Sequence, residues 1–231
     1  MSNHPTTPKQ RARLTGLLYL IVIICAGFSQ GYVRGTIVVP GDAAGTALNI
    51  LEQGGLFRLG LAADLIAFTA DAVIAVLFYQ LFKPVSQTLS MVAAALRLLA
   101  HPAIASLNLL NHYMAQHVLE STDWALSHSP EQLYDWSLLF MDAHRAGYLI
   151  AGALFGLHCL LLGILIYRSD LIPKAFGVLM SLAGLTYLME TFGVFLFPGH
   201  DAWLALLVGG AAALGEVSLM GYLLARGVRE R

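Results

Sequence analysis

The chain has 231 residues, of which 58% are hydrophobic and only 12% charged, and its mean hydropathy is +0.70. A soluble domain carries charge on about a quarter of its residues, so this composition excludes an ordinary soluble fold. The formal net charge of −1 gives no reason to expect a nucleic-acid partner.

The hydrophobic residues fall in six blocks, each close to the ~20 residues that a helix needs to cross a bilayer. The first block begins at Leu14, behind basic residues that would also suit a signal peptide. A small-residue cleavage site followed by a soluble chain is missing, so this block is expected to remain as a helix. The six blocks are 14–33, 59–82, 89–118, 146–167, 175–197 and 203–225. They predict one all-α domain over 1–231, a polytopic membrane helix bundle.

Charge predicts how the bundle is oriented. One set of block ends carries most of the basic residues: Lys9, Arg11, Arg13, Lys83, Arg168, Lys174, Arg226, Arg229 and Arg231. The opposite ends are mainly acidic, with Arg34 and Arg58 as the clear basic exceptions. The excess of Lys and Arg on the cytoplasmic side of membrane proteins therefore predicts cytoplasmic tails at 1–13 and 226–231. Trp124, Trp136 and Trp203 fall at the opposite interface, as an aromatic belt would.

Two outer connections carry helical signals of their own. Asp42 is a candidate N-cap for a short helix that ends at the Gly54-Gly55 pair. The sequence from Ser129 to Gln132 has the pattern of a capping box with proline at the first helical position. Both segments are predicted to be short interfacial helices on the outer surface, which either shield the bundle or cover a cavity.

Ionisable residues inside the blocks are the main functional signal, because each costs at least ~2.5–3.5 kcal/mol at membrane depth. Asp64 and Asp71 are seven residues apart and share nearly one face of the second helix. At ~100° per residue, Arg97, His101 and Asn108 lie within roughly 40° of one another on the third helix. This spacing predicts a polar stripe. Pro102 lies beside the stripe and is expected to kink the helix.

The later helices add His144 and Arg145 near an outer end, His158 deeper in the fourth helix, Glu190 in the fifth and Glu216 in the sixth. Sorted by depth, a middle layer comprises Asp71, Arg97, His101, His158 and Glu216, and an outer layer comprises Asp64, His112, Asp142, His144, Arg145 and Glu190. Polar groups become rare toward the cytoplasm. We therefore expect a polar cavity that opens outward, although Asp71 and Arg97 could be an ion pair that only fixes helix register.

Several segments resemble a family of bacterial multi-pass membrane proteins known as domain of unknown function 4386. They are RLTGLLYL at 13–20, VRG at 33–35, VPGDAA at 39–44, GLFRLG at 55–60, FGLHCLLLG at 155–163, RSDLIP at 168–173 and LGE at 214–216. The resemblance covers nearly the whole chain and implies a helical protein of the bacterial cytoplasmic membrane, without implying an activity. Within the matching segments, His158 and Glu216 are the ionisable positions inside the membrane.

The first functional hypothesis is an acid–base enzyme or binder acting on a lipophilic small molecule. Asp71, His158 and Glu216 at similar depth would supply proton donors and acceptors, and Arg97 would hold an anionic group. Around them, the ligand-binding candidates are Asp64, His101, Asn108, Glu190 and Arg145. The expected partners are membrane lipids and a lipophilic ligand.

Two alternatives remain open. Carboxylates and histidines at mid-membrane also suit a proton-coupled carrier, although six helices without an evident repeat make a small one unless it forms a homodimer. A haem or metal protein is the other alternative. His112 would face His144 and His101 would approach His158 if the third and fourth helices are antiparallel neighbours.

Overall fold

The computed structural model describes residues 7–229, and all regular structure in that part of the chain is helical. The first half comprises α1 (Pro8–Ala26), η1 (Gly27–Arg34), α2 (Gly35–Ile37), α3 (Ala43–Glu52), α4 (Gly54–Phe82), α5 (Gln87–Leu98), η2 (Leu99–Ala105) and α6 (Ser106–Glu120). The second half comprises α7 (Thr122–Ser127), α8 (Pro130–Arg168), α9 (Lys174–Leu196), α10 (Asp201–Ala212), η3 (Ala213–Val217) and α11 (Ser218–Ala225). The three η segments are π-helical turns inside longer helices.

Six of the resulting helices are long and apolar enough to cross a membrane, which confirms the predicted polytopic helical bundle. They are Pro8–Ile37, Gly54–Phe82, Gln87–Glu120, Pro130–Arg168, Lys174–Leu196 and Asp201–Ala225. Most extend beyond the hydrophobic blocks because a helix continues into the interface, where its residues are no longer apolar. The fourth is the longest, with 39 residues.

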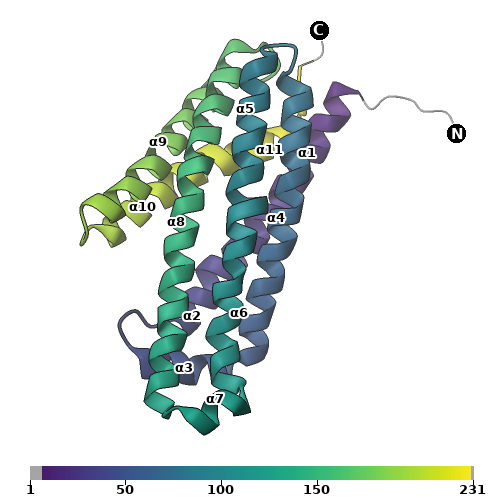
Figure 1. The fold of residues 1–231 in the computed structure, drawn as a ribbon. Helices are drawn as coiled ribbons and strands as arrows, with labels where there is room; N and C mark the ends of the chain where they lie inside the picture. Colours follow the sequence, from purple (N-terminus) through teal and green to yellow (C-terminus); the bar gives the residue numbers. More distant parts are fainter. Residues whose placement is uncertain (1–6, 230–231) are drawn as a thin grey trace, which may run out of the picture.

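Figure 1 shows how these helices are arranged. The helix α4, the continuous α5–η2–α6 helix and α8 stand side by side, and α1 packs against α4. The short helices α2, α3 and α7 cluster at one end of the bundle, which we call the α3 end. At the opposite end α1 begins and α11 ends, and Arg13 Nη2 donates to the carbonyl of Ala225 at 3.5 Å. The α9–α10 hairpin leans out from the side of the bundle, and α9 packs along the half of α8 that lies farther from the α3 end.

Two expectations about the connections were wrong. The capping box at Ser129 does not start a separate interfacial helix, because the turn it caps continues without a break as α8. Gly54 and Gly55 do not end a helix either, since they form the first turn of α4 after the one-residue junction at Gln53. By contrast, Asp42 does cap α3, and its side chain accepts from the backbone amide of Gly45 at 2.8 Å.

The π-helical segments place polar residues where a regular α-helix would not. Pro102 lies inside η2, and the wider turn accommodates the missing amide donor of proline. The carbonyl of His101, next to the proline, accepts from the Ser106 hydroxyl at 3.2 Å. Each such turn accommodates about one extra residue, so the residues that follow it shift to another face of the helix.

Close helix packing accompanies this geometry in the second half of the chain. Gly156 of α8 and Gly184 of α9 lie against each other, and a Cβ at Gly156 would be 2.9 Å from the Gly184 carbonyl oxygen. Small residues of this kind let helix backbones approach closely in a membrane, where no hydrophobic force drives association. The α8–α9 contact therefore fixes one wall of the site described next.

Candidate functional site

A buried ion pair lies in the middle of the bundle, between Asp71 of α4 and Arg97 of α5. The side chains of both residues are 0% exposed. Arg97 Nε donates to Asp71 Oδ1 at 3.1 Å, and Arg97 Nη2 pairs with the same oxygen. We call this the central pair. Its geometry agrees with the ion pair that the sequence suggested for these two residues.

Two histidines complete the central pair. His101 Nδ1 lies 2.6 Å from the second carboxylate oxygen of Asp71. His158 Nε2 lies 3.1 Å from Arg97 Nη1, and His158 Nδ1 lies 2.8 Å from the carbonyl of Ala93. Because arginine only donates, His158 must accept at Nε2 and donate from Nδ1. Both of its nitrogens are therefore occupied within the protein.

Aromatic rings enclose the guanidinium of Arg97. Its central carbon lies 4.9 Å from the ring centre of Tyr19 and 5.1 Å from that of Phe155. Such cation–π contacts strengthen when the cation is removed from water. The Arg97 guanidinium therefore has hydrogen-bond partners for its N–H groups and aromatic rings close to its central carbon.

Glu216 of η3 is held next to this centre by two tyrosines. The hydroxyl of Tyr19 donates to Glu216 Oε2 at 2.7 Å, and the hydroxyl of Tyr187 donates to Oε1 at 2.7 Å. Tyr19 contacts both Arg97 and Glu216, so it links the two charged groups. The carboxylate is fixed in position and keeps lone pairs for a further donor.

A pocket of about 230 Å³ lies against these groups, between α1, η2, α8, α9 and the α10–η3 helix. Its lining is mostly apolar, with five polar side chains and nine smaller or apolar residues. They are Val22, Ile23, Ala26, His101, Tyr148, Leu149, Gly152, Phe155, Tyr187, Glu190, Ala212, Ala213, Glu216 and Val217. Such a lining, with a few convergent polar groups, is typical of a small-molecule site.

The structure separates the predicted site residues into those that reach the pocket and those that do not. His101, Glu190 and Glu216 line it. Asp71, Arg97 and His158 lie behind His101, and none of the three is among the lining residues. His101, rather than His158, is therefore the histidine of the central group that faces the pocket.

A second buried ion pair lies nearer the α3 end. Arg34 of η1 and Asp64 of α4 approach to 2.8 Å, with side chains 9% and 1% exposed. We call this the second pair. Arg34 Nε donates to Gln30 Oε1 at 3.0 Å, and Arg34 Nη1 lies 3.3 Å from His112 Nδ1. Neither Arg34 nor Asp64 lines the pocket.

Sequence reasoning missed Arg34, which was treated as a basic exception at the outer interface. The available signal was its spacing, because Arg34 lies four residues after Gln30 and three residues before the apolar Ile37, inside a helix that continues to Ile37. A residue at such a place can turn inward, and Arg34 is buried.

Asn108 contacts His144 rather than the central pair, contrary to the predicted polar stripe. Its side-chain amide donates to the carbonyl of His144 at 2.6 Å. The reason is the π-helical turn η2, which lies between His101 and Asn108 and rotates the later residues away from Arg97. The stripe is therefore divided, with Arg97 and His101 at Asp71 and Asn108 beside His144.

The histidines do not form the arrangement that the metal hypothesis required. The rings of His112 and His144 do meet, with centres 5.7 Å apart, but His112 Nε2 lies 3.0 Å from the Phe57 carbonyl and its Nδ1 faces Arg34. Within residues 7–229, no three His, Cys, Asp or Glu side chains are grouped closely enough to hold a metal ion. The donor atoms of His112 and His158 already have protein partners, which favours the other hypotheses.

Arg145, a predicted ligand-binding residue, lies outside the pocket. Its Nη2 is 2.7 Å from Asp201 Oδ1, in a pair whose side chains are 60% and 33% exposed. The pair connects α8 to the start of α10. We therefore assign it to the surface.

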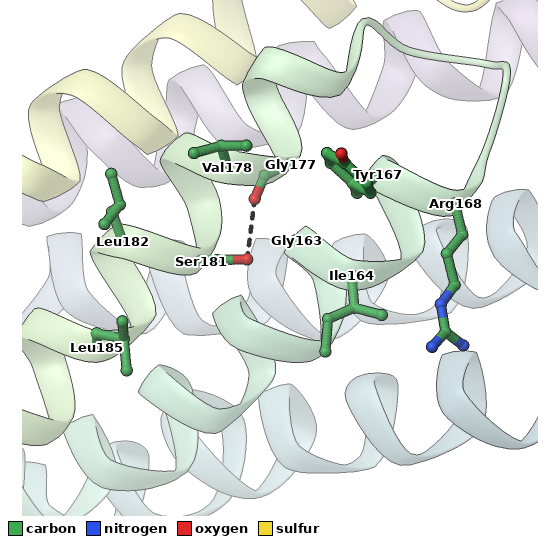
Figure 2. Close-up of a pocket in the computed structure, with 9 residues that line it drawn as sticks. All are labelled: Gly163, Ile164, Tyr167, Arg168, Gly177, Val178, Ser181, Leu182 and Leu185. Carbon is green, nitrogen blue, oxygen red and sulfur yellow. Dashed lines mark hydrogen bonds between the residues drawn. The ribbon is translucent and has the colours of Figure 1, made fainter.

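A second hollow, of about 250 Å³, lies between α8 and α9 (Figure 2). Figure 2 shows its mostly apolar lining and a hydrogen bond within it, in which the Ser181 hydroxyl donates to the Gly177 carbonyl at 3.0 Å. The residues that line it include no carboxylate or histidine, and Arg168 at one end is the one charged residue among them. This groove lacks the acid–base groups that the pocket beside Glu216 has.

Taken together, the fold and the buried charges define a polytopic helical membrane protein with two ion-paired centres inside the bundle. The chain belongs to the family described as domain of unknown function (DUF4386), whose sequence profile matches residues 14–227. It is also similar to an uncharacterised protein of Archaeoglobus fulgidus, with 27% identity over 157 residues, which cover 68% of this chain and 76% of that protein. No solved structure matches the chain.

Proposed function

We propose that this protein binds a lipophilic small molecule in the pocket beside Glu216 and carries out acid–base chemistry on its polar group. The observation that carries the proposal is the position of one histidine and two carboxylates, His101, Glu190 and Glu216, on the wall of an otherwise apolar pocket. Charged groups inside a membrane bundle are costly, and those that face a cavity are most often functional.

His101 is the proposed base. The Asp71 carboxylate lies 2.6 Å from His101 Nδ1 and holds a proton on that nitrogen, which leaves Nε2 as the basic nitrogen. A carboxylate that orients an imidazole in this way also stabilises the cation formed when the imidazole takes up a proton. Arg97 and His158 act as positioning residues on the side away from the pocket, because Arg97 bonds to Asp71 and His158 in turn bonds to Arg97.

Glu216 is the proposed partner for the polar group of the ligand. The two tyrosine hydroxyls restrict the carboxylate to one orientation and leave acceptor capacity directed at the pocket. The apolar remainder of the lining would accept a hydrocarbon body. A ligand with a hydroxyl or amine on an isoprenoid-like or acyl skeleton fits this division.

We also propose that both ends of the chain lie in the cytoplasm, so that the α3 end faces outward. The proposal is supported by the excess of Lys and Arg at those block ends that lie on the same side of the bundle as the two termini. In a bacterial cell, a protein with this orientation would lie in the cytoplasmic membrane. A cysteine placed at exposed Leu126 of α7 would react with an impermeant thiol reagent added to intact cells, whereas one placed at exposed Arg226 would react only after lysis.

The ligand site can be tested by native mass spectrometry of protein released from nanodiscs made with natural lipid extract. The wild-type protein is expected to retain an added mass, and Ala212→Phe, which fills the pocket, is expected to lose it. Ala205→Phe is the matched control, because Ala205 is on the same helix but exposed and outside the pocket. A bare wild-type protein, or equal retention by both variants, would count against the site.

Chemical modification tests the role of His101 without a known ligand. Diethyl pyrocarbonate reacts with an accessible basic imidazole nitrogen, so His101 is expected to react faster than His158, whose two nitrogens are occupied. Equal rates at the two histidines would remove the reason for choosing His101 as the base.

A further inference from the structure

Four polar side chains form a row along one face of α6. Asn108, His112, Gln116 and Glu120 follow one another at intervals of four residues, which places them on the same side of the helix. The first three are buried, whereas the Glu120 side chain is 44% exposed at the α3 end. We call this the α6 polar row.

The outer half of the row is continuous. Gln116 Nε2 donates to Glu120 Oε1 at 2.6 Å and lies 3.4 Å from the carbonyl of Gly54. Arg58 approaches Glu120 to 3.6 Å from α4, and its side chain is 64% exposed. The row therefore starts among solvated charges and runs inward to His112 and Asn108.

The inner half of the row meets polar atoms that the protein leaves unsatisfied. Within residues 7–229, His144 Nε2 is buried and has no hydrogen-bond partner, and Asp64 Oδ1 and Gln30 Nε2 are buried with only a loose approach from Ser29 to the carboxylate and from Tyr148 to the amide. Asp64 is 1% exposed, and His144 is 3% exposed. Buried polar atoms in native proteins nearly always have a partner, and bound water supplies it where the protein does not.

The chemistry of these atoms favours water over an ion. They combine an acceptor carboxylate, a donor amide nitrogen and an imidazole nitrogen that can do either, which matches the two donors and two acceptors of water. The adjacent guanidinium of Arg34 disfavours a cation, and the Asp64 carboxylate disfavours an anion.

Tyr148 connects this region to the pocket. Its ring centre lies 6.5 Å from that of His144 and 6.0 Å from that of His101, and both Tyr148 and His101 line the pocket. Polar side chains therefore follow one another in space from the α3 end, past the second pair, to His101, the proposed base.

We propose that the α6 polar row and the atoms around Asp64 hold a file of bound water that joins the α3 end to the pocket. This route would exchange protons between the surface and His101. It serves the ligand site proposed above, but its test uses no ligand, so either proposal can fail without the other.

X-ray radiolytic labelling in nanodiscs tests the route, because hydroxyl radicals formed from bound water modify the side chains beside it. Phe57 is fully buried and stacks on His112 with ring centres 3.8 Å apart. Phe82 is equally buried but lies in the apolar core, near the end of the bundle where α1 begins and α11 ends. It is therefore the matched control for a side chain without neighbouring water. Phe57 is expected to be labelled on the order of tenfold faster than Phe82. Equal rates would overturn the proposal.

A variant pair tests the path itself. Gln116→Leu removes one polar step and is expected to lower labelling of His144 and Tyr148 by about threefold or more. Gln80→Leu, an exposed position on α4 at the other end, is expected to change neither. Unchanged labelling of His144 and Tyr148 in Gln116→Leu would exclude the α6 polar row as the route. If that variant does not fold, the wild-type comparison of Phe57 with Phe82 still decides.

Discussion

The central pair and the second pair use the same two kinds of residue but are completed in different ways. Around Asp71 and Arg97, two histidines and several aromatic rings occupy the hydrogen-bonding positions and the ring faces. Around Arg34 and Asp64, by contrast, buried polar atoms such as His144 Nε2 have no hydrogen-bond partner within residues 7–229.

The difference separates two uses of buried charge. A satisfied network is rigid and fixes the relative positions of the helices that supply it. A network with spare donors and acceptors depends on water and can change its occupants at lower cost. We therefore regard the central pair as the support of the pocket and the second pair as part of a hydrated route.

The largest expected effect comes from breaking the central pair on one side. Arg97→Leu leaves the Asp71 carboxylate buried and uncompensated, which should lower the free energy of unfolding by about 3–5 kcal/mol. Replacing Asp71 by leucine as well should recover more than half of that loss. Unfolding in mixed detergent with increasing SDS gives both values. A single variant as stable as wild type would show that the pair does not stabilise the fold.

The same change in the second pair should cost less. Arg34→Leu is expected to lower the free energy of unfolding by about 1–3 kcal/mol, because water can replace part of what Asp64 loses. The same SDS titration measures it beside Arg97→Leu. A cost equal to or above that of Arg97→Leu would remove the distinction between the two pairs.

The tyrosines on Glu216 should give a smaller effect. Tyr19→Phe and Tyr187→Phe each remove one hydroxyl donor, at about 1 kcal/mol apiece. Since both hydroxyls serve one carboxylate, the double variant should lose more than the sum. Additive losses in a double-mutant cycle would mean that the two hydroxyls act on Glu216 independently.

The smallest effect is expected at the surface. Arg145→Gln breaks the exposed pair with Asp201 and should change stability by no more than about 1 kcal/mol, and by less at high salt. Thermal unfolding at low and high salt checks this value. A larger, salt-independent loss would indicate that Arg145 has a buried role that the structure does not assign to it.

Hydropathy was sufficient to predict the six spanning helices, because the length of each block reflects the thickness of a bilayer. The ends were less predictable. Ser129 and its capping box mark a true helix start, but only the structure shows that the helix continues through to Arg168. A capping pattern fixes where a helix begins and carries no information on where it stops.

The candidate site was predictable in composition but only partly in pairing. Asp71 and Arg97 could be matched because they are opposite charges predicted at one depth on consecutive helices. His101 and His158 could not be told apart, since which of them faces the pocket depends on small rotations of η2 and α8. Asn108 was misplaced because a constant angle per residue does not apply across a π-helical turn.

The three π-helical segments have a consequence for how this family can vary. Gln30 and Arg34 lie in η1, His101 lies in η2 and Glu216 lies in η3, so each charged centre depends on a helix that holds about one surplus residue. Deleting a single residue from η2 would restore a regular helix and turn everything after it by about 100°. Relatives that keep these centres should therefore conserve the length of these segments more strictly than that of the loops.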